Sequence, residues 1–339
     1  MPRYDEHDVE HYDRPRRRTR PRTKERPAHD DAVDGVVVTV DRGRFTLLVG
    51  AGSESRVVMA MKARPLGRKG VVVGDRVRVV GDVSGADGSL ARIVEVTPRA
   101  TVLRRTADDD DPVERVVVAN ATQLVVVTAL TDPEPRPRLI DRALVAAYDA
   151  GLAPLLCLTK SDLADPEVLL STYRSLGVPW VVTRRGPDRS ILGLEEVRER
   201  LAGQVSVLVG HSGVGKSTLV NALVPDARRE TGHVNAVTGR GRHTSTSAVL
   251  LALPGWGDGG WIVDTPGIRS FGLAHVQPEH LIEAFPDLDE MTEDCPRGCT
   301  HGEDEPECGL DEAVASGAAD PERVASFRRL LAARSVTDY

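Results

Sequence analysis

The run Gly210-His-Ser-Gly-Val-Gly-Lys-Ser-Thr218 constrains the fold of this 339-residue chain more than any other feature. It fits the pattern G-x-x-x-x-G-K-[ST] at every position, and it lies between an apolar run over Val205–Val209 and a segment with helical spacing. This strand–loop–helix context predicts a phosphate-binding loop, because glycines let backbone N–H groups approach phosphate oxygens. A plain glycine turn is the alternative, and the context argues against it.

Short apolar runs alternate with segments of helical periodicity ahead of this loop. The apolar runs predict strands over 123–129, 154–159, 179–183 and 205–209. The periodic segments predict helices over 138–148, 166–176 and 192–201. Such alternation predicts a doubly wound α/β sheet, in which ligand-binding motifs belong at the C-terminal ends of strands.

The phosphate loop supplies most of the predicted nucleotide ligands. Lys216 would neutralise β- and γ-phosphate charge, and the hydroxyl of Ser217 would bind Mg²⁺. The other residues of the loop that we expect to contact nucleotide are Gly210, Ser212, Gly213, Val214, Gly215 and Thr218.

A second motif, Asp264-Thr-Pro-Gly267, follows a predicted strand over 261–263. Asp264 is predicted to hold Mg²⁺ through a water molecule. The N–H of Gly267 is predicted to meet the γ-phosphate, which would make the following segment a switch. The pattern D-x-x-G is weak alone, but it gains weight from its position after a phosphate loop.

The motif Thr159-Lys-Ser-Asp162 also stands at a strand end. Asp162 can accept two hydrogen bonds from the N1 and N2 protons of guanine, which adenine does not offer, and Lys160 can lie across the base. Thr159, Lys160 and Asp162 are therefore predicted to bind guanine. The alternative is a helix N-cap, for which Ser161 and Asp162 are both suitable.

The segment Gly239–Thr246 lies where the loop that completes Mg²⁺ coordination is expected. Thr244 is the first candidate for this second Mg²⁺ ligand, ahead of Ser245 and Thr246. A flexible polar loop is the alternative interpretation.

The position after Asp-Thr-Pro-Gly holds Ile268, where a glutamine would orient the attacking water. Isoleucine cannot do this, so the missing group must come from elsewhere in the chain or from a partner. His243 is the internal candidate for this catalytic role, because imidazole hydrogen-bonds water near neutral pH. A histidine on a surface loop is the alternative.

Three cysteines and one histidine crowd together near the C-terminus, at Cys295, Cys299, His301 and Cys308. Three thiolates and one imidazole suit a closed tetrahedral Zn²⁺ site, which leaves no open position and so predicts one structural ion. Free cysteines in a small core are the alternative, but Pro, Gly, Glu and Asp fill the segment. Cys157 stands apart in a predicted strand and is expected to be a buried apolar residue.

The N-terminal third divides into a polar tail and a run of strands. Residues 1–34 combine arginine, proline and threonine with little to bury, which predicts a disordered tail that either grips phosphates or only aids solubility. Residues 35–99 predict a small β-barrel, of which an OB-fold is the commonest kind, with an SH3-like barrel as the alternative. The expected strands are 35–40, 44–49, 55–60, 76–80 and 91–96. The barrel would bind nucleic acid or only dock on a neighbour.

The net charge of −7 means that any nucleic-acid contact needs a local basic patch. Neither a secretory h-region nor an apolar stretch long enough for a bilayer is found in the sequence, so we expect a cytoplasmic protein without a membrane partner.

The order of the motifs is unusual, because the guanine motif at 159 precedes the phosphate loop at 210 and the motifs at 244 and 264. A doubly wound sheet tolerates such a circular permutation where the original ends lie close together. With the barrel and the Cys-Cys-His-Cys cluster, this order resembles the ribosome small-subunit-dependent GTPase family of the RsgA (YjeQ) type. The resemblance rests on residues 210–218, 240–246, 264–267 and the metal cluster, and spans residues 35–335.

The resemblance implies a multidomain protein. Its parts would be an OB-fold barrel, an α/β circularly permuted P-loop GTPase domain over 115–274, and an α-helical zinc-binding domain over 275–339. It implies hydrolysis of GTP with Mg²⁺, stimulated by the 30S ribosomal subunit during its late maturation, with 16S rRNA as the RNA partner. His243 matches the histidine proposed as catalytic in the family. We expect a monomer without a DNA partner.

Two departures from the family pattern concern guanine. Thr159 replaces the usual asparagine, and Thr183-Arg-Arg-Gly186 stands where Ser-Ala usually backs the base. The spacing of the metal cluster also differs by one residue in two places. Two other functions stay open at this point: a non-enzymatic RNA-binding assembly module, and an ATP-specific P-loop enzyme, which would gain support if Asp162 were only a helix cap.

Overall fold

The computed structural model describes residues 29–50, 52–67, 70–106, 114–188, 190–225, 248–254, 259–265, 273 and 276–335. The chain forms two units, residues 1–31 and 32–339, and the description below concerns the second. The predicted tail lies almost entirely outside the described residues, which begin at residue 29.

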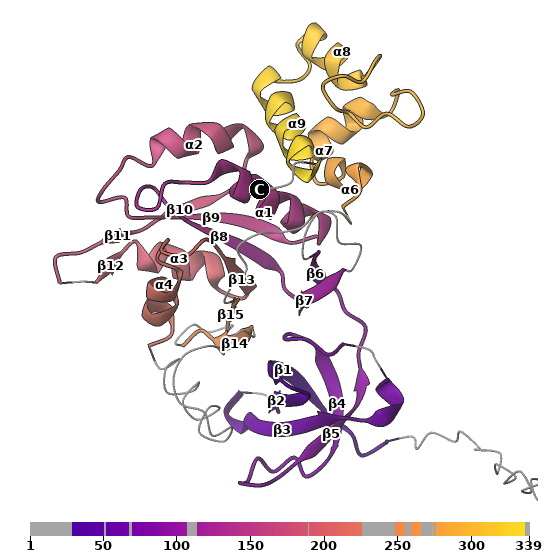
Figure 1. Cartoon of the computed structure of the whole chain (residues 1–339), viewed down its shortest axis with the longest axis vertical. Helices are drawn as coiled ribbons and strands as arrows, with labels where there is room; N and C mark the ends of the chain where they lie inside the picture. Colours follow the sequence, from indigo (N-terminus) through magenta and orange to yellow (C-terminus); the bar gives the residue numbers. More distant parts are fainter. Residues whose placement is uncertain are drawn as a thin grey trace, which may run out of the picture. The chain divides into compact units, whose positions relative to one another are not determined.

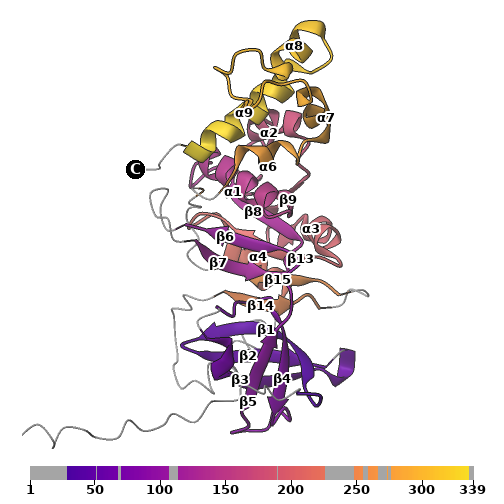
Figure 2. The same cartoon turned by 90° about the vertical axis from the view of Figure 1, so that its right-hand side faces the viewer.

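Five strands form a closed barrel at the start of the second unit (Figure 2). They are β1 (Val33–Asp41), β2 (Arg44–Val49), β3 (Arg56–Lys62), β4 (Arg76–Gly81) and β5 (Ala91–Val96). The order is β1-β2-β3-β5-β4, and β4 pairs back onto β1 to close the ring. The pair β3–β5 is parallel and the other neighbours are antiparallel. This closed five-stranded ring is OB-like, as predicted.

The barrel has its own core, because alternate residues of its strands point inward. Val37, Phe45, Leu47 and Ile93 are each at most 5% exposed. Phe45, the one aromatic residue in this part of the sequence, is therefore part of the core and does not offer a stacking surface for bases. Short 3-10 turns, η2 (Gly52–Glu54) and η3 (Arg64–Leu66), flank β3.

The middle of the chain folds as the predicted α/β sheet (Figure 1). Its strands are β8 (Gln123–Ala129), β9 (Ala153–Thr159), β10 (Trp180–Val182), β13 (Val205–Val209), β14 (Val249–Ala252) and β15 (Trp261–Asp264). The spatial order is β10-β9-β8-β13-β15-β14, with β14 alone antiparallel to its neighbour β15. The strand before the phosphate loop, β13, therefore lies between β8 and β15, although it follows β8–β10 in the chain.

Helices cover both faces of this sheet, because its strands are apolar on both sides. In β8, Leu124 and Val126 belong to one apolar cluster, whereas Val125 and Val127 belong to another. The first cluster includes α1 (Pro137–Asp149), α2 (Glu167–Tyr173) and the 3-10 turn η4 (Arg174–Leu176); the second includes α3 (Leu194–Leu201) and α4 (Lys216–Leu223).

The C-terminal segment is helical, as expected from the resemblance. It contains α6 (Pro278–Ile282), α7 (Pro286–Asp289), η5 (Glu290–Thr292), α8 (Gly309–Ser316) and α9 (Pro321–Ser335). Phe285 and Phe327 are at most 1% exposed and pack edge to face, with ring centroids 5.3 Å apart. Both residues belong to the same apolar cluster as α1, so the helical segment shares a core with one face of the sheet.

Two charged residues of α1 fix α9 to this face. Asp141 is 4% exposed and lies 3.3 Å from Nε of Arg329, while Arg142 donates to the carbonyl oxygen of Ala333 at 2.9 Å. Burial raises the pKa of Asp141, and the charge of Arg329 opposes that shift.

Two short hairpins complete the described structure, β6 (Val102–Arg105) with β7 (Arg115–Ala119), and β11 (Arg184–Arg185) with β12 (Ile191–Leu192). In the part of the chain that the structure describes, every helix is too short or too polar to cross a bilayer.

Candidate functional site

The phosphate loop joins the end of β13 to the first turn of α4, as predicted. Gly213 and Gly215 have φ angles of 86° and 94°, in the left-handed region that side chains disfavour. A Cβ atom at Gly210 would lie 2.3 Å from the carbonyl oxygen of Val127 in β8. Glycine is therefore required at these three positions by the backbone itself, and the loop leads into the positive end of α4.

Lys216 and Asp264 meet because their strands are neighbours. β13 and β15 pair in parallel, with Leu208 opposite Asp264. Lys216 Nζ lies 2.6 Å from Asp264 Oδ1 and also donates to the carbonyl oxygen of Thr265 at 3.1 Å. The hydroxyl of Thr265 in turn donates to the carbonyl oxygen of Leu208 at 2.8 Å. The cation predicted for phosphate and the carboxylate predicted for Mg²⁺ thus occupy one small region.

The remaining residues of the loop differ in exposure. Ser212 and Gly213 are exposed, as are Ser217 and Thr218 in the first turn of α4, whereas Val214 is 3% exposed. Polar atoms that could contact nucleotide therefore face solvent, while Val214 anchors the loop in the core between the sheet and α4.

Thr159 joins the guanine motif to the phosphate loop. It ends β9, is 6% exposed, and donates its hydroxyl proton to the carbonyl oxygen of Val214 at 2.6 Å. Lys160, with φ of 62°, donates from Nζ to the carbonyl oxygen of Asp132 in the loop after β8. Thr159, which replaces the usual asparagine, thus makes a direct hydrogen bond between the two motifs. The sequence analysis did not predict this bond.

Asp162 is exposed and does not cap the following helix. The residue before α2 is Pro166, and the carboxylate that accepts from the backbone N–H of Glu167, at 2.9 Å, belongs to Asp165. Asp162 Oδ1 instead accepts from the backbone N–H of Arg185 at 3.2 Å. The N-cap interpretation of this motif is therefore wrong, and Asp162 stays available for a base.

The segment predicted to back the guanine base lies beside the motif. The N–H of Ser161 donates to the carbonyl oxygen of Thr183 at 3.2 Å. With the contact of Arg185 to Asp162, this brings residues 183–185 next to the predicted base-binding residues, although the Ser-Ala sequence is missing.

Three predicted site residues, His243, Thr244 and Gly267, lie outside the described residues, as does Ile268. Their predicted roles remain predictions.

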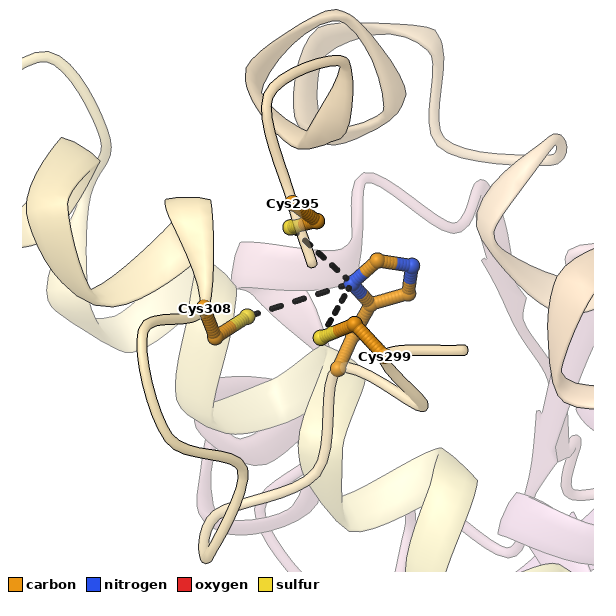
Figure 3. A group of neighbouring side chains, drawn as sticks. Cys295, Cys299 and Cys308 are labelled. Carbon is orange, nitrogen blue, oxygen red and sulfur yellow. Dashed lines mark hydrogen bonds between the residues drawn. The ribbon is translucent and has the colours of Figure 1, made fainter. Parts of the chain in front are cut away.

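The four predicted metal ligands converge in the helical segment (Figure 3). The Sγ atoms of Cys295, Cys299 and Cys308 lie 3.6, 3.5 and 3.8 Å from Nδ1 of His301. A tetrahedral ion bound at about 2.3 Å to sulfur and about 2.0 Å to nitrogen would place these atoms about 3.5 Å apart. The donor set and its spacing therefore fit a closed Zn²⁺ site.

Backbone contacts hold this cluster in place. Gly309, the first residue of α8, donates its N–H to Cys295 Sγ at 3.1 Å. A Cβ atom at Gly309 would lie 2.4 Å from the carbonyl oxygen of Met291, so only glycine fits there. Cys157, by contrast, is fully buried in β9, and burial raises the pKa of its thiol to about 12, as expected for an apolar core residue.

Comparisons with known proteins point to one family. A sequence model of the RsgA GTPase family matches residues 96–274. The Small ribosomal subunit biogenesis GTPase RsgA of Pseudomonas aeruginosa (strain LESB58) is 42% identical over 254 residues, which cover 73% of this chain and 72% of that protein.

Two solved structures resemble the fold. YjeQ from Thermotoga maritima is 28% identical, with a TM-score of 0.62 over 89% of this chain and 98% of that one. YloQ, described as a circularly permuted GTPase, has a TM-score of 0.63 over 91% of this chain and 97% of that one. At 22% identity, YloQ supports the fold alone.

The permuted sheet, the phosphate loop at its centre and these matches lead to one conclusion: the chain belongs to the RsgA GTPase family and is a GTP hydrolase.

Proposed function

We propose that this enzyme binds the small (30S) ribosomal subunit, assists its late maturation, and hydrolyses GTP to GDP and phosphate faster when bound there. The observation that carries the proposal is the direct hydrogen bond from Thr159 to Val214, which holds the predicted guanine motif against the phosphate loop. The name of the Pseudomonas aeruginosa relative supports the ribosomal part.

The base and the phosphates would be bound by different strand ends. Asp162 would accept hydrogen bonds from guanine, exchanging its contact with the N–H of Arg185, and Lys160 would lie along the base. Lys216 would exchange Asp264 for the β- and γ-phosphates, to which its charge is better matched. Binding of GTP would therefore replace internal contacts with contacts to the ligand.

Mg²⁺, when bound, would neutralise the charge that develops on the phosphates. The hydroxyls of Ser217 and Thr244 would hold it directly, and Asp264 through a water molecule. The Gly267 N–H would contact the γ-phosphate.

Hydrolysis would proceed by attack of water on the γ-phosphorus, with the bridging oxygen leaving on GDP and the water proton passing to solvent or phosphate. His243 is proposed to orient that water, because Ile268 cannot. Slow turnover of the isolated enzyme follows from the same substitution.

The wider organisation belongs to the same proposal. We infer four parts, with a disordered tail over 1–34, an OB-fold over 35–99, the GTPase domain over 115–274 and a zinc-binding domain over 275–339. The cluster Cys295, Cys299, His301 and Cys308 would hold one structural Zn²⁺. The enzyme would work in the cytoplasm as a monomer, with 16S rRNA and not DNA as its nucleic-acid partner.

The test is to measure GTP and ATP hydrolysis with and without purified 30S subunits. We expect GTP-selective turnover that rises at least roughly tenfold on the subunit, as an added transition-state contact would give. Turnover unchanged by 30S would overturn the ribosomal part while leaving the GTPase. Equal use of ATP would show that Asp162 does not select guanine.

A further inference from the structure

The metal centre lies in an unusually acidic segment. The stretch His301-Gly-Glu-Asp-Glu-Pro-Glu-Cys308 carries four carboxylates and no lysine or arginine. Three thiolates around a divalent ion already leave one excess negative charge. Arg297, between the first two cysteines, is exposed. A cation that approaches the cluster from the buried side would therefore have a large effect on its affinity for metal.

Arg328 of α9 is such a cation. Its side chain is only 12% exposed. Nε donates to the carbonyl oxygen of the ligand residue His301 at 3.2 Å, and Nη1 donates to Asp311 of α8 at 2.7 Å. The guanidinium thus bridges the loop that carries His301 and the helix that follows Cys308.

The third nitrogen of this guanidinium has a distinctive position. Nη2 is buried and has no hydrogen-bond partner within the described residues. Nε and Nη1 therefore hold the loop that carries His301 and the helix α8, while the buried Nη2 adds its positive charge close to that loop.

We propose that Arg328 is a positioning residue of the metal centre, which orients His301 through its carbonyl group and places a buried positive charge near the negatively charged cluster. A cation is held more strongly near thiolates than near thiols, so metal binding and the position of the arginine favour each other. The role depends on both the charge and the forked shape of the guanidinium.

Arg323, one and a half turns earlier on α9, provides a matched control. It also pairs with a helical carboxylate, Asp287 at 2.8 Å, and it donates to a backbone carbonyl oxygen, that of Ser175 at 2.9 Å. None of these groups is a predicted metal ligand. Replacing Arg323 therefore disturbs the packing of α9 without removing charge from the cluster.

The experiment measures the Zn²⁺ dissociation constant of the full-length protein by competition with a chromophoric chelator. Arg328→Met should weaken binding roughly 10- to 100-fold, as loss of groups that orient metal ligands does. Arg328→Lys should recover part of that loss, because it keeps the charge. Arg323→Met should bind Zn²⁺ like the wild type. GDP affinity, unchanged in every variant, shows that the GTPase sheet is folded.

Two further measurements separate charge from packing. Asp311→Asn removes the partner in α8 but leaves the guanidinium and its hydrogen bond to His301, so it should weaken Zn²⁺ binding less than Arg328→Met does. The absorption of bound Co²⁺ should shift in Arg328→Met, because a buried positive charge near the thiolates is lost. Wild-type affinity in Arg328→Met, or equal losses in Arg328→Met and Arg323→Met, would overturn the proposal.

Discussion

The predicted nucleotide site and the predicted metal centre of this enzyme are built in opposite ways. The predicted metal ligands come from fourteen consecutive residues, and their donor atoms all lie within 4.8 Å of one another. The described nucleotide residues come from segments near 159, 210 and 264, which the sheet brings together. Residues of these segments contact one another: Lys216 pairs with Asp264, and Thr159 donates to the carbonyl oxygen of Val214.

This difference predicts that loss of zinc and loss of nucleotide affect the fold differently. A cluster of thiols on a short segment with little core of its own would depend on a bound ion for order, so the predicted zinc would be part of the fold. The nucleotide residues stand on strands that bury a large apolar core on both faces. Removing nucleotide should therefore leave the sheet intact, whereas removing zinc should not leave the cluster intact.

The largest expected effect is the loss of a metal ligand. Cys308→Ser should abolish stoichiometric zinc, because structural zinc binding contributes on the order of 10 kcal/mol to folding of its segment. Hydrogen exchange should accelerate over residues 290–316 and stay slow in β8 and β13. Cys157→Ala is the control, since it should keep zinc while weakening the sheet around β9. Slow hydrogen exchange over 290–316 without zinc would show that this segment does not depend on the ion for its order.

The next effect concerns the phosphate loop. Lys216→Ala should lower the rate constant for GTP hydrolysis roughly 100- to 1000-fold, because a preorganised charge no longer stabilises the transition state. Thermal stability should change little, since the pair with Asp264 is partly exposed. Steady-state kinetics and calorimetry together check this. A variant that unfolds instead would mean that the nucleotide site also supports the fold.

Base selection should show a smaller effect. Asp162→Ala should lower the preference for GDP over ADP roughly 10- to 100-fold, because hydrogen bonds to a charged acceptor are lost. Asp165→Ala makes a matched control, as that carboxylate accepts from the N–H of Glu167 at the start of α2. It should cost stability without changing base preference. Equal preferences in the two variants would place guanine recognition elsewhere.

The smallest effect sharpens the role of Thr159. Thr159→Val leaves the carbonyl oxygen of Val214 without this donor and should cost about 1–2 kcal/mol of stability. Nucleotide affinity should fall by less than about tenfold. Ser206→Ala removes another buried hydrogen bond, at 2.8 Å to Gln123 in the same sheet, and should leave nucleotide affinity unchanged. Calorimetry on both variants, with and without GDP, measures how much stability and how much nucleotide affinity each variant loses.

The sequence predicts the centre of the sheet well. β8 and β13 have the predicted bounds, because uniform apolar runs are typical of strands buried on both faces. The candidate metal ligands and the glycines of the phosphate loop are equally easy to recognise in the sequence, since each set has a characteristic spacing. The antiparallel strand β14 and the two short hairpins were missed, as segments of two to five residues carry too little periodicity.

Contacts between side chains and backbone groups far away in the chain also could not be predicted from the sequence. The bond from Thr159 to Val214 joins residues 55 positions apart, and nothing in either segment indicates it. The position of Arg328 behind the metal ligands likewise depends on how α9 packs. Such contacts are set by the tertiary structure, and local patterns do not encode them.

The permuted strand order has a consequence for synthesis. Of the strands of this sheet, β8, β9 and β10 leave the ribosome first and can pair at once, but the other edge of β8 waits for β13. About 75 residues separate Ala129 from Val205, which at roughly 5–20 residues per second is a delay of several seconds. Until then an apolar edge strand stays open, and such edges invite pairing with other chains. The pairing of β8 with β13, in the middle of the finished sheet, therefore forms late. The nascent chain is most prone to aggregation just before β13 and the phosphate loop are synthesised.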